Sequence, residues 1–98
     1  MLRNFRIYIV AIRFYKLCKD LDLPPDAKDQ LVRAARSIGN NAAEGYGRIL
    51  TRDKRCFYRI ALGSAGECQS VFDQEDVTDP VLTDLVDFLG GGLYKLVR

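Results

Sequence analysis

The sequence predicts an all-α protein: an antiparallel up-down four-helix bundle in a single domain that covers residues 1–98. Three observations lead to this prediction. In four segments of the chain, apolar residues recur every three or four positions, which is the spacing of one face of an α-helix. Short connections join these segments, so consecutive helices are expected to run antiparallel. The chain offers no internal repeat and no credible pair of strands.

The length and composition fit one small soluble domain. A chain of 98 residues has no room for a second core. Hydrophobic residues make up 48% and charged residues 29%, which is an ordinary balance for a globular protein. The apolar run from Ile7 to Ile12 is too short to cross a membrane and does not read as a signal peptide. We therefore expect a cytoplasmic protein with no part in a membrane.

The first predicted helix covers residues 4–22. It carries two adjacent apolar stripes, one of Leu2, Phe5, Ile9 and Ile12, the other of Ile7, Val10, Phe14, Leu17 and Leu21. The β-branched segment IYIVAI would also suit a short strand. The stripes extend well beyond six residues, which favours a helix. An apolar arc this wide predicts contacts on more than one side.

The second predicted helix runs from Pro25 to Tyr46. Pro24 and Pro25 end the first helix and begin the second, because proline suits the first turn of a helix. Gly47 is placed to end it in a left-handed conformation. The apolar face consists of Ala27, Leu31, Ala34, Ala35, Ile38, Ala42 and Gly45.

The third predicted helix begins at an N-cap formed by Thr51, with Asp53 in its first turn. It fades in the acidic stretch at residues 73–76. Its predicted inner face consists of Phe57, Ile60, Ala61, Ser64, Cys68 and Val71.

The fourth predicted helix is capped by Thr78 or Asp79 and has Pro80 in its first turn. Gly90, Gly91 and Gly92 interrupt its pattern, and each costs about 1 kcal/mol relative to alanine in a helix. They predict either a kink or break, or the close approach of another backbone. The inner stripe consists of Leu82, Leu85, Leu89, Leu93 and Leu96.

The cysteines give no sign of a metal centre or a disulfide framework. The chain has three of them, Cys18, Cys56 and Cys68, with no CxxC spacing and no histidine anywhere. We expect small buried thiols in a reducing compartment. No cofactor and no metal are expected.

The stretch SIGNNAAEGYGR, residues 37–48, has two interpretations. Its glycines and asparagines suggest a phosphate-binding loop, but such a loop needs a strand before it, and a P-loop needs a lysine before its Ser or Thr. The helical interpretation explains more, because small residues at Ala35, Gly39 and Ala43 permit a close helix approach. The opposite flank forms a polar seam that we expect to pair with the third helix. Its members are Gln30, Ser37, Asn41, Glu44 and Arg48, with Ser64 and Glu67 as partners.

Catalysis is not expected from this chain. Glu44 and Glu67 are candidates for an acid/base pair or for di-metal ligands. A bundle di-iron site requires Glu-x-x-His pairs, and the chain contains no histidine. A small bundle rich in alanine and leucine also leaves little room for a substrate cavity. We therefore predict a protein that is not an enzyme.

The charges divide the chain in two. Residues 1–59 carry 13 Lys and Arg against 6 Asp and Glu, whereas residues 60–98 carry 2 against 7. The positive groups suit phosphate contacts and salt-dependent nucleic-acid binding. The alternatives are a solvated basic face, or one that pairs with the acidic region of a neighbouring subunit. The candidate nucleic-acid-binding residues are Arg33, Arg36, Arg48, Arg52, Lys54, Arg55 and Arg59.

Two runs in the same region resemble a known protein family. QLVRAARSIGNNAAEGYGR and FYRIALGSAGE, over residues 30–67, resemble the four-helix bundle proteins found in intervening sequences of bacterial 23S rRNA genes. The first predicted helix fits this family loosely, and the fourth fits only through its helical spacing of apolar residues. The signature falls on Gln30, Arg33, Ser37, Ile38, Asn41, Ala43, Glu44, Gly45, Gly47, Arg48, Gly63, Ser64 and Glu67.

The resemblance implies an up-down bundle that assembles into a ring, often a homopentamer. It also implies kinship with the accessory protein of diversity-generating retroelements, which engages a reverse transcriptase and nucleic acid through a basic surface. The chain departs from the family at Ala42, where isoleucine is preferred. It departs again in a short third helix and in the triple glycine.

The sequence therefore predicts a non-enzymatic homo-oligomer that binds structured RNA or an RNA–DNA hybrid. The alternative is a protein-interaction scaffold that docks a reverse transcriptase or another protein and has no direct contact with nucleic acid.

Overall fold

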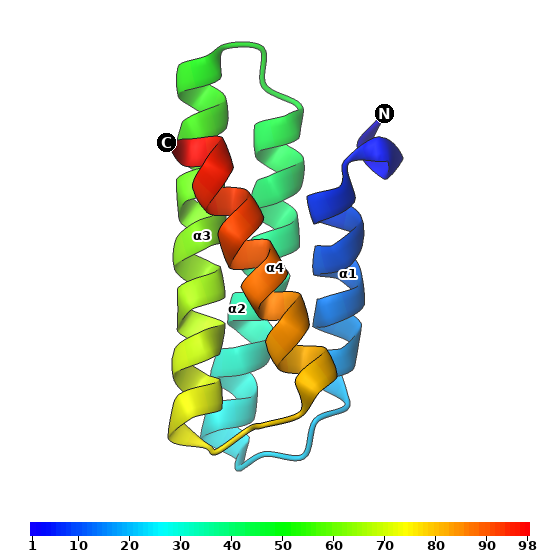
Figure 1. Ribbon diagram of the computed structural model, residues 1–98, viewed down its shortest axis with the longest axis vertical. Coiled ribbons are helices and arrows are strands. Elements are labelled where there is room, and N and C mark those ends of the chain that lie inside the picture. The colour runs from blue at the N-terminus through cyan, green and yellow to red at the C-terminus, as the bar shows by residue number, and fades with distance from the viewer.

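The computed structural model describes all 98 residues and contains four α-helices in an antiparallel bundle (Figure 1). A short 3₁₀ turn, η1 (Leu2–Asn4), precedes α1 (Arg6–Lys19), which is followed by α2 (Pro25–Tyr46), α3 (Thr51–Gln74) and α4 (Pro80–Val97). No strand is present. The predicted fold class is confirmed.

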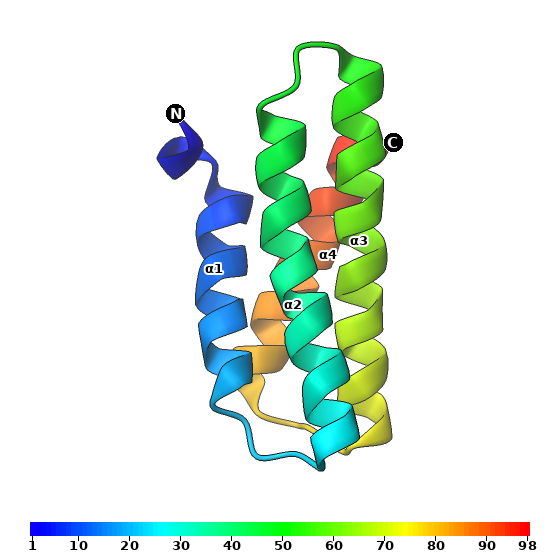
Figure 2. The same ribbon diagram turned by 180° about the vertical axis from the view of Figure 1, so that it is seen from behind.

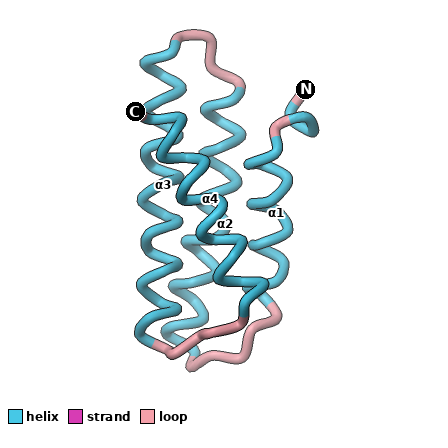
Figure 3. The backbone as a smooth tube through the Cα atoms, in the orientation of Figure 1, coloured by secondary structure: helices cyan, strands magenta, loops and turns pink.

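The α2–α3 hairpin is the longest part of the bundle. Its two helices share the most extensive contact in the protein, α1 packs along α2, and α4 crosses α3 obliquely and reaches α1 (Figures 1 and 3). The hairpin extends past the ends of α1 and α4, so the α2–α3 loop forms one tip of a molecule that measures 40 × 22 × 20 Å (Figure 2). None of the helices is both long and apolar enough to traverse a lipid bilayer.

All four helices contribute to one apolar core. Phe14 of α1 meets Phe72 of α3 edge-on, with ring centroids 6.0 Å apart, and both side chains are buried. The largest side chains with almost no exposed surface are Phe14, Leu31, Ile38, Leu89 and Leu93. The α2 face is confirmed, because every predicted member except half-buried Ala27 is buried.

The second α1 stripe faces the core more fully than the first, of which Phe5 packs against the core only in part. Ile7 and Phe14 of the second stripe are buried, whereas Ile9 of the first stripe is 49% exposed. The core also takes Ala11 and Cys18, two small residues that the stripes of large apolar side chains do not include. α1 packs on α2 and α4 at once, and these two contacts determine which part of its apolar arc is covered.

The inner faces of α3 and α4 lie at a different angle from the predicted ones. Ile60 is 48% exposed and Phe57 is only half-buried. Leu96 is 38% exposed and Leu85 is half-buried. The buried positions that the prediction missed are Tyr58, Ala65, Phe72 and Val86. α3 lies between α2 and α4, so its buried arc turns toward both neighbours rather than following the most apolar stripe.

The helix ends confirm two predictions and overturn two others. Pro25 begins α2, and Asp79 caps α4 by accepting a hydrogen bond from the Val81 backbone N–H at 2.9 Å. Thr51 is the first residue of α3 rather than its cap, because Leu50 occupies the cap position. Gly47 has φ −79° and is not left-handed.

The Lys54 ammonium explains how α2 ends without a left-handed glycine. Its Nζ donates hydrogen bonds to the backbone carbonyls of Gly45 at 3.2 Å and Tyr46 at 3.0 Å. A cation there also complements the negative end of the α2 dipole. The side chain therefore supplies a donor to the Tyr46 carbonyl and a second donor to the Gly45 carbonyl, which also accepts from the Arg48 backbone N–H at 3.2 Å.

The three glycines neither kink nor break α4, which continues to Val97. A Cβ on Gly92 would lie 2.6 Å from Cδ1 of Ile7, so α1 approaches α4 closely at this point. Nothing lies within 4 Å of a Cβ placed on Gly90 or Gly91. The structure therefore supports the close-approach interpretation, with an α1 side chain rather than a backbone as the neighbour.

Candidate nucleic-acid interface

Five of the seven predicted nucleic-acid-binding residues lie at the tip of the α2–α3 hairpin. Arg48 is in the loop, and the first turns of α3 carry Arg52, Lys54, Arg55 and Arg59. A spacing of three and four places Arg52, Arg55 and Arg59 on one stripe of α3, and all three are exposed. None of these three forms an ion pair, because the only two ion pairs in the protein involve Arg33 and Arg48.

Arg48 and Lys54 already have partners within the protein. Arg48 pairs with Glu44 at 3.0 Å, and its guanidinium carbon lies 4.6 Å from the centre of the Phe57 ring. Lys54 is half-buried and holds the end of α2. The structure therefore distinguishes these two cations, which have partners within the protein, from the exposed and unpaired arginines of α3. A count of charges in the sequence does not show this difference.

Arg33 and Arg36 lie farther along α2. Arg36 is 12 positions before Arg48 in the sequence, a separation of roughly 18 Å at the rise of an α-helix. Arg33 forms an exposed ion pair with Asp29 at 2.9 Å, while Arg36 is exposed and has no acidic partner. The seven residues thus form a cluster at the tip and a separate pair on α2.

The N-terminus is attached to the hairpin tip by an aromatic group whose mutual contacts the sequence patterns do not predict. Phe5 stacks on Tyr46 with centroids 4.8 Å apart, and it also contacts Tyr58 at 5.9 Å. The Tyr46 hydroxyl donates to the backbone carbonyl of Met1 at 3.1 Å. Arg3 and Arg6 are therefore held toward the same end as the arginine cluster.

The acidic part of the chain gathers at the opposite end of the bundle. Because the helices run antiparallel, the α1–α2 and α3–α4 loops lie together, far from the α2–α3 loop (Figure 1). These two loops carry Asp20, Asp22, Glu75, Asp76 and Asp79. The arginines at the tip and these acidic loops therefore lie at opposite ends of the long axis, although Lys16, Lys19 and Lys28 flank the α1–α2 loop at the acidic end.

Three members of the predicted polar seam are linked to one another. Ser64 of α3 donates to the Ser37 hydroxyl of α2 at 2.8 Å. The Asn41 amide donates to the carbonyl of Ser37 at 2.9 Å and to its hydroxyl at 3.0 Å. This small network crosses between the helices at partly buried positions, where unpaired polar groups would be costly.

The remaining members of the seam do not join the network. Glu44 and Arg48 pair with each other along α2 rather than across to α3. Gln30 and Glu67 have no side-chain hydrogen bond within the protein. Glu67 instead lines an open pocket of about 290 Å³ beside the network, together with Arg33, Ala34, Ser37 and Ser64.

The thiols differ from one another in exposure. Cys18 and Cys68 are buried, as predicted, but Cys56 is exposed, so that part of the prediction is wrong. Burial raises the pKa of the Cys18 thiol to about 12, and the Lys28 ammonium offsets this only in part. The pKa of Cys68 is raised by burial and further by Cys18 and Glu67. No group of three or more His, Cys, Asp or Glu side chains is arranged to hold a metal ion.

A comparison with protein families decides where this bundle belongs. The family described as "23S rRNA-intervening sequence protein" matches residues 6–76. The chain belongs to this family. The resemblance seen in the sequence is confirmed, and the family description names no enzymatic activity. No curated protein and no solved structure shows a significant match.

The match to the 23S rRNA-intervening sequence protein family covers α1, α2 and α3, and it stops before α4. It includes the tip, the Ser37–Ser64 network and the whole signature. α4 is therefore outside the match, although it contributes Leu82, Val86, Leu89 and Leu93 to the core.

Proposed function

We propose that this protein is a non-enzymatic bundle that binds structured RNA or an RNA–DNA hybrid through the arginines of α3. The observation that carries the proposal is the stripe of Arg52, Arg55 and Arg59, which is exposed and free of acidic partners. Unpaired guanidinium groups are available for phosphate oxygens without first breaking an ion pair. Arg36 adds a fourth such group on α2.

The charge separation supports an oriented contact. Phosphate backbones are attracted to the tip and repelled by the acidic loops at the other end, so the tip should meet the nucleic acid first. Such contacts recognise phosphates rather than base sequence, so we expect little sequence preference. The family takes its description from an intervening sequence of 23S rRNA, which makes RNA the first ligand to test.

A gel-shift titration with structured RNA and with an RNA–DNA hybrid at low salt tests this proposal. The triple variant Arg52→Ala/Arg55→Ala/Arg59→Ala should bind more weakly. Its salt dependence should be shallower by about 0.7–0.9 in log–log slope for each phosphate that the variant no longer neutralises. The matched control removes three cations from α1, Arg13→Ala/Lys16→Ala/Lys19→Ala, and should bind nearly as the wild type does. Equal weak binding by the wild type and both variants would refute the proposed surface.

Self-association is the second part of the proposal. Its support is the family resemblance, which implies a ring and favours a homopentamer, together with the opposed charges at the two ends of the bundle. A homo-oligomer also suits a chain this short, which buries little surface alone. Static light scattering at micromolar concentration should give a mass several times that of one chain, and a monomer would count against it.

A protein-docking role is the alternative function. The loop at the tip exposes Ile49 at 93% and Leu50 at 56%, and apolar side chains have no use in phosphate contact. A reverse transcriptase is the partner that the family resemblance suggests. An affinity pull-down discriminates the two roles, because a protein partner that survives nuclease treatment favours docking.

A further inference from the structure

The tip of the hairpin combines exposed apolar residues with positive charge. Ile49 and Leu50 lie in the α2–α3 loop, and both side chains are exposed, Ile49 more than any other large apolar residue of the chain. Arg48 and Arg52 flank them in the sequence, and both are exposed. Ile49 is 93% exposed and Leu50 56%, and the tip that carries them projects beyond α1 and α4 (Figure 2).

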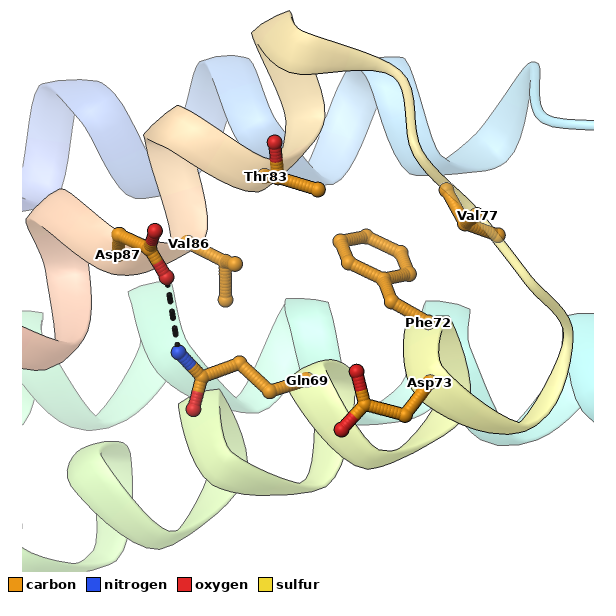
Figure 4. Close-up of a pocket in the computed structure, with 7 residues that line it drawn as sticks. All are labelled: Gln69, Phe72, Asp73, Val77, Thr83, Val86 and Asp87. Atoms are coloured by element: carbon orange, nitrogen blue, oxygen red, sulfur yellow. Dashed lines mark hydrogen bonds between the residues drawn. The ribbon is translucent and has the colours of Figure 1, made fainter.

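A pocket at the other end of the molecule has the complementary character. It lies between the end of α3 and the start of α4 and has a volume of about 230 Å³ (Figure 4). Phe72, Val77 and Val86 form its apolar part. Asp73 and Asp87 provide its negative charge, and Asp87 accepts a hydrogen bond from Gln69 at 3.1 Å.

The pocket is too small for most organic ligands. Sites for small molecules typically measure about 300–1,000 Å³. A single branched aliphatic side chain is a better match for this volume, and it would contact the apolar part of a lining that is otherwise polar and acidic. Asp73 makes no side-chain hydrogen bond or ion pair within the protein, so it is available to a cation brought in beside such a side chain.

We propose that Ile49 of one copy docks into the α3–α4 pocket of a second copy, with Leu50 at the rim of the pocket and with Arg48 and Arg52 facing Asp73 and Asp87. The tip cannot reach the pocket of its own chain, because the two lie toward opposite ends of a bundle 40 Å long. The contact uses two different surfaces, so it is heterologous and generates either a closed ring or a filament. This inference rests on the proposed self-association and names the surfaces that make it.

Site-specific cross-linking tests the contact directly. In a Cys56→Ser background, Ile49→Cys and Thr83→Cys are placed in separate chains that are then mixed under mild oxidation. Thr83 lines the pocket, so disulfide-linked heterodimers should accumulate. The control replaces Thr83→Cys with Asn40→Cys, an exposed position on α2. A heterodimer yield no higher with Thr83→Cys than with Asn40→Cys would overturn the proposal.

Charge reversal provides an independent test. Arg52→Asp alone and Asp73→Arg alone should each lower the mass measured by light scattering, because each places like charges across the contact. An equimolar mixture of the two variants should regain mass above that of either single variant, since the pocket of Asp73→Arg can then accept the tip of Arg52→Asp. Single variants that assemble like the wild type, or a mixture that stays as small as the single variants, would contradict the contact.

The Ile49→Ser variant separates this inference from nucleic-acid binding. Docking engages Arg48 and Arg52, whereas Arg55 and Arg59 stay exposed for RNA. The variant should therefore still bind RNA in a gel shift while its mass falls. If Ile49→Ser assembles normally while the triple arginine variant no longer binds RNA, the proposed function stands and the docking contact is wrong. A wild-type protein that is monomeric would overturn the contact and leave the RNA proposal intact.

Discussion

Gly45 and Gly91 both lie inside helices, but their surroundings differ. A Cβ on Gly45 would lie 2.6 Å from Cε1 of Tyr58 and 2.8 Å from its Cδ1, and that ring is buried. The same atom on Gly91 would meet nothing within 4 Å. At Gly45, therefore, the absence of a side chain allows α3 to approach α2, whereas Gly91 has no such role.

We expect opposite effects from the same substitution at these two positions. Gly45→Ala should destabilise the protein by about 1–3 kcal/mol, because the Tyr58 ring must move. Gly91→Ala should stabilise it by about 0.5–1 kcal/mol, because alanine loses less entropy in a helix. Urea unfolding followed by circular dichroism measures both. A stabilising Gly45→Ala would contradict the close packing of α2 and α3.

The three thiols should react in two classes. Cys56 is exposed, whereas burial raises the pKa of Cys18 and Cys68, which keeps both as unreactive thiols. At pH 8 iodoacetamide should therefore modify Cys56 alone, and denaturant should release the other two. Mass spectrometry of the labelled peptides gives the answer, and fast labelling of Cys18 in the native protein would disprove its burial.

The same pKa shifts predict a loss of stability at alkaline pH. The folded state keeps the Cys18 proton up to about pH 12, whereas an unfolded thiol loses it near 9.0. Stability from this group is therefore fully present below about pH 9 and falls as the pH rises toward 12. Urea midpoints at pH 8 and pH 10 should show the decrease, and a Cys18→Ala/Cys68→Ala variant should show a smaller one.

At the scale of the helices, Lys54 connects the end of α2 to the start of α3. Its two hydrogen bonds to carbonyls of α2 make it a structural cation within the basic cluster. Lys54→Met should cost about 1–2 kcal/mol of stability, since the Tyr46 carbonyl loses its donor and the Gly45 carbonyl keeps only the Arg48 backbone N–H. Arg55→Ala, an exposed neighbour on the same helix, should change stability by less than about 0.5 kcal/mol.

For RNA affinity the order should be reversed, with Arg55→Ala losing more than Lys54→Met. Arg55 is exposed and unpaired, so its removal should weaken binding more than the removal of Lys54. Thermal unfolding and gel shifts on the same protein preparations make the comparison. Equal stability of Lys54→Met and the wild type would remove the proposed capping role.

For the whole molecule, the main question is whether the packing of α4, which lies outside the family match, contributes to stability as the packing of α1, α2 and α3 does. Leu89 is fully buried, whereas Leu96 on the same helix is 38% exposed. Leu89→Ala should therefore cost about 2–5 kcal/mol, the range for emptying a leucine site in a core. Leu96→Ala should cost clearly less. Similar small effects would indicate that α4 is not packed against α1 and α3.

Part of the candidate site could be predicted because charge and helical spacing are local properties. The arginine stripe of α3 follows directly from residues three and four positions apart. The separation of Lys54 from its arginine neighbours could not be predicted, since it depends on where the end of α2 lies. The exposed Ile49 and Leu50 carry a signal in the sequence, two apolar residues between Arg48 and Arg52, but only the projecting loop shows that nothing covers them.

The sequence by itself determined the four helices, the bounds of α2, the cap at Asp79, the family and the division of charge. These follow from proline, hydrophobic spacing and short-range hydrogen bonds, which act within a few residues. The tertiary structure alone decided which apolar stripe of α1 is buried, how Ser37 meets Ser64 and why Gly92 is tolerated. It also placed the arginine cluster of the tip and the acidic loops at opposite ends. Each of these depends on contacts between helices, and the sequence of a single helix does not determine which of its neighbours cover which face.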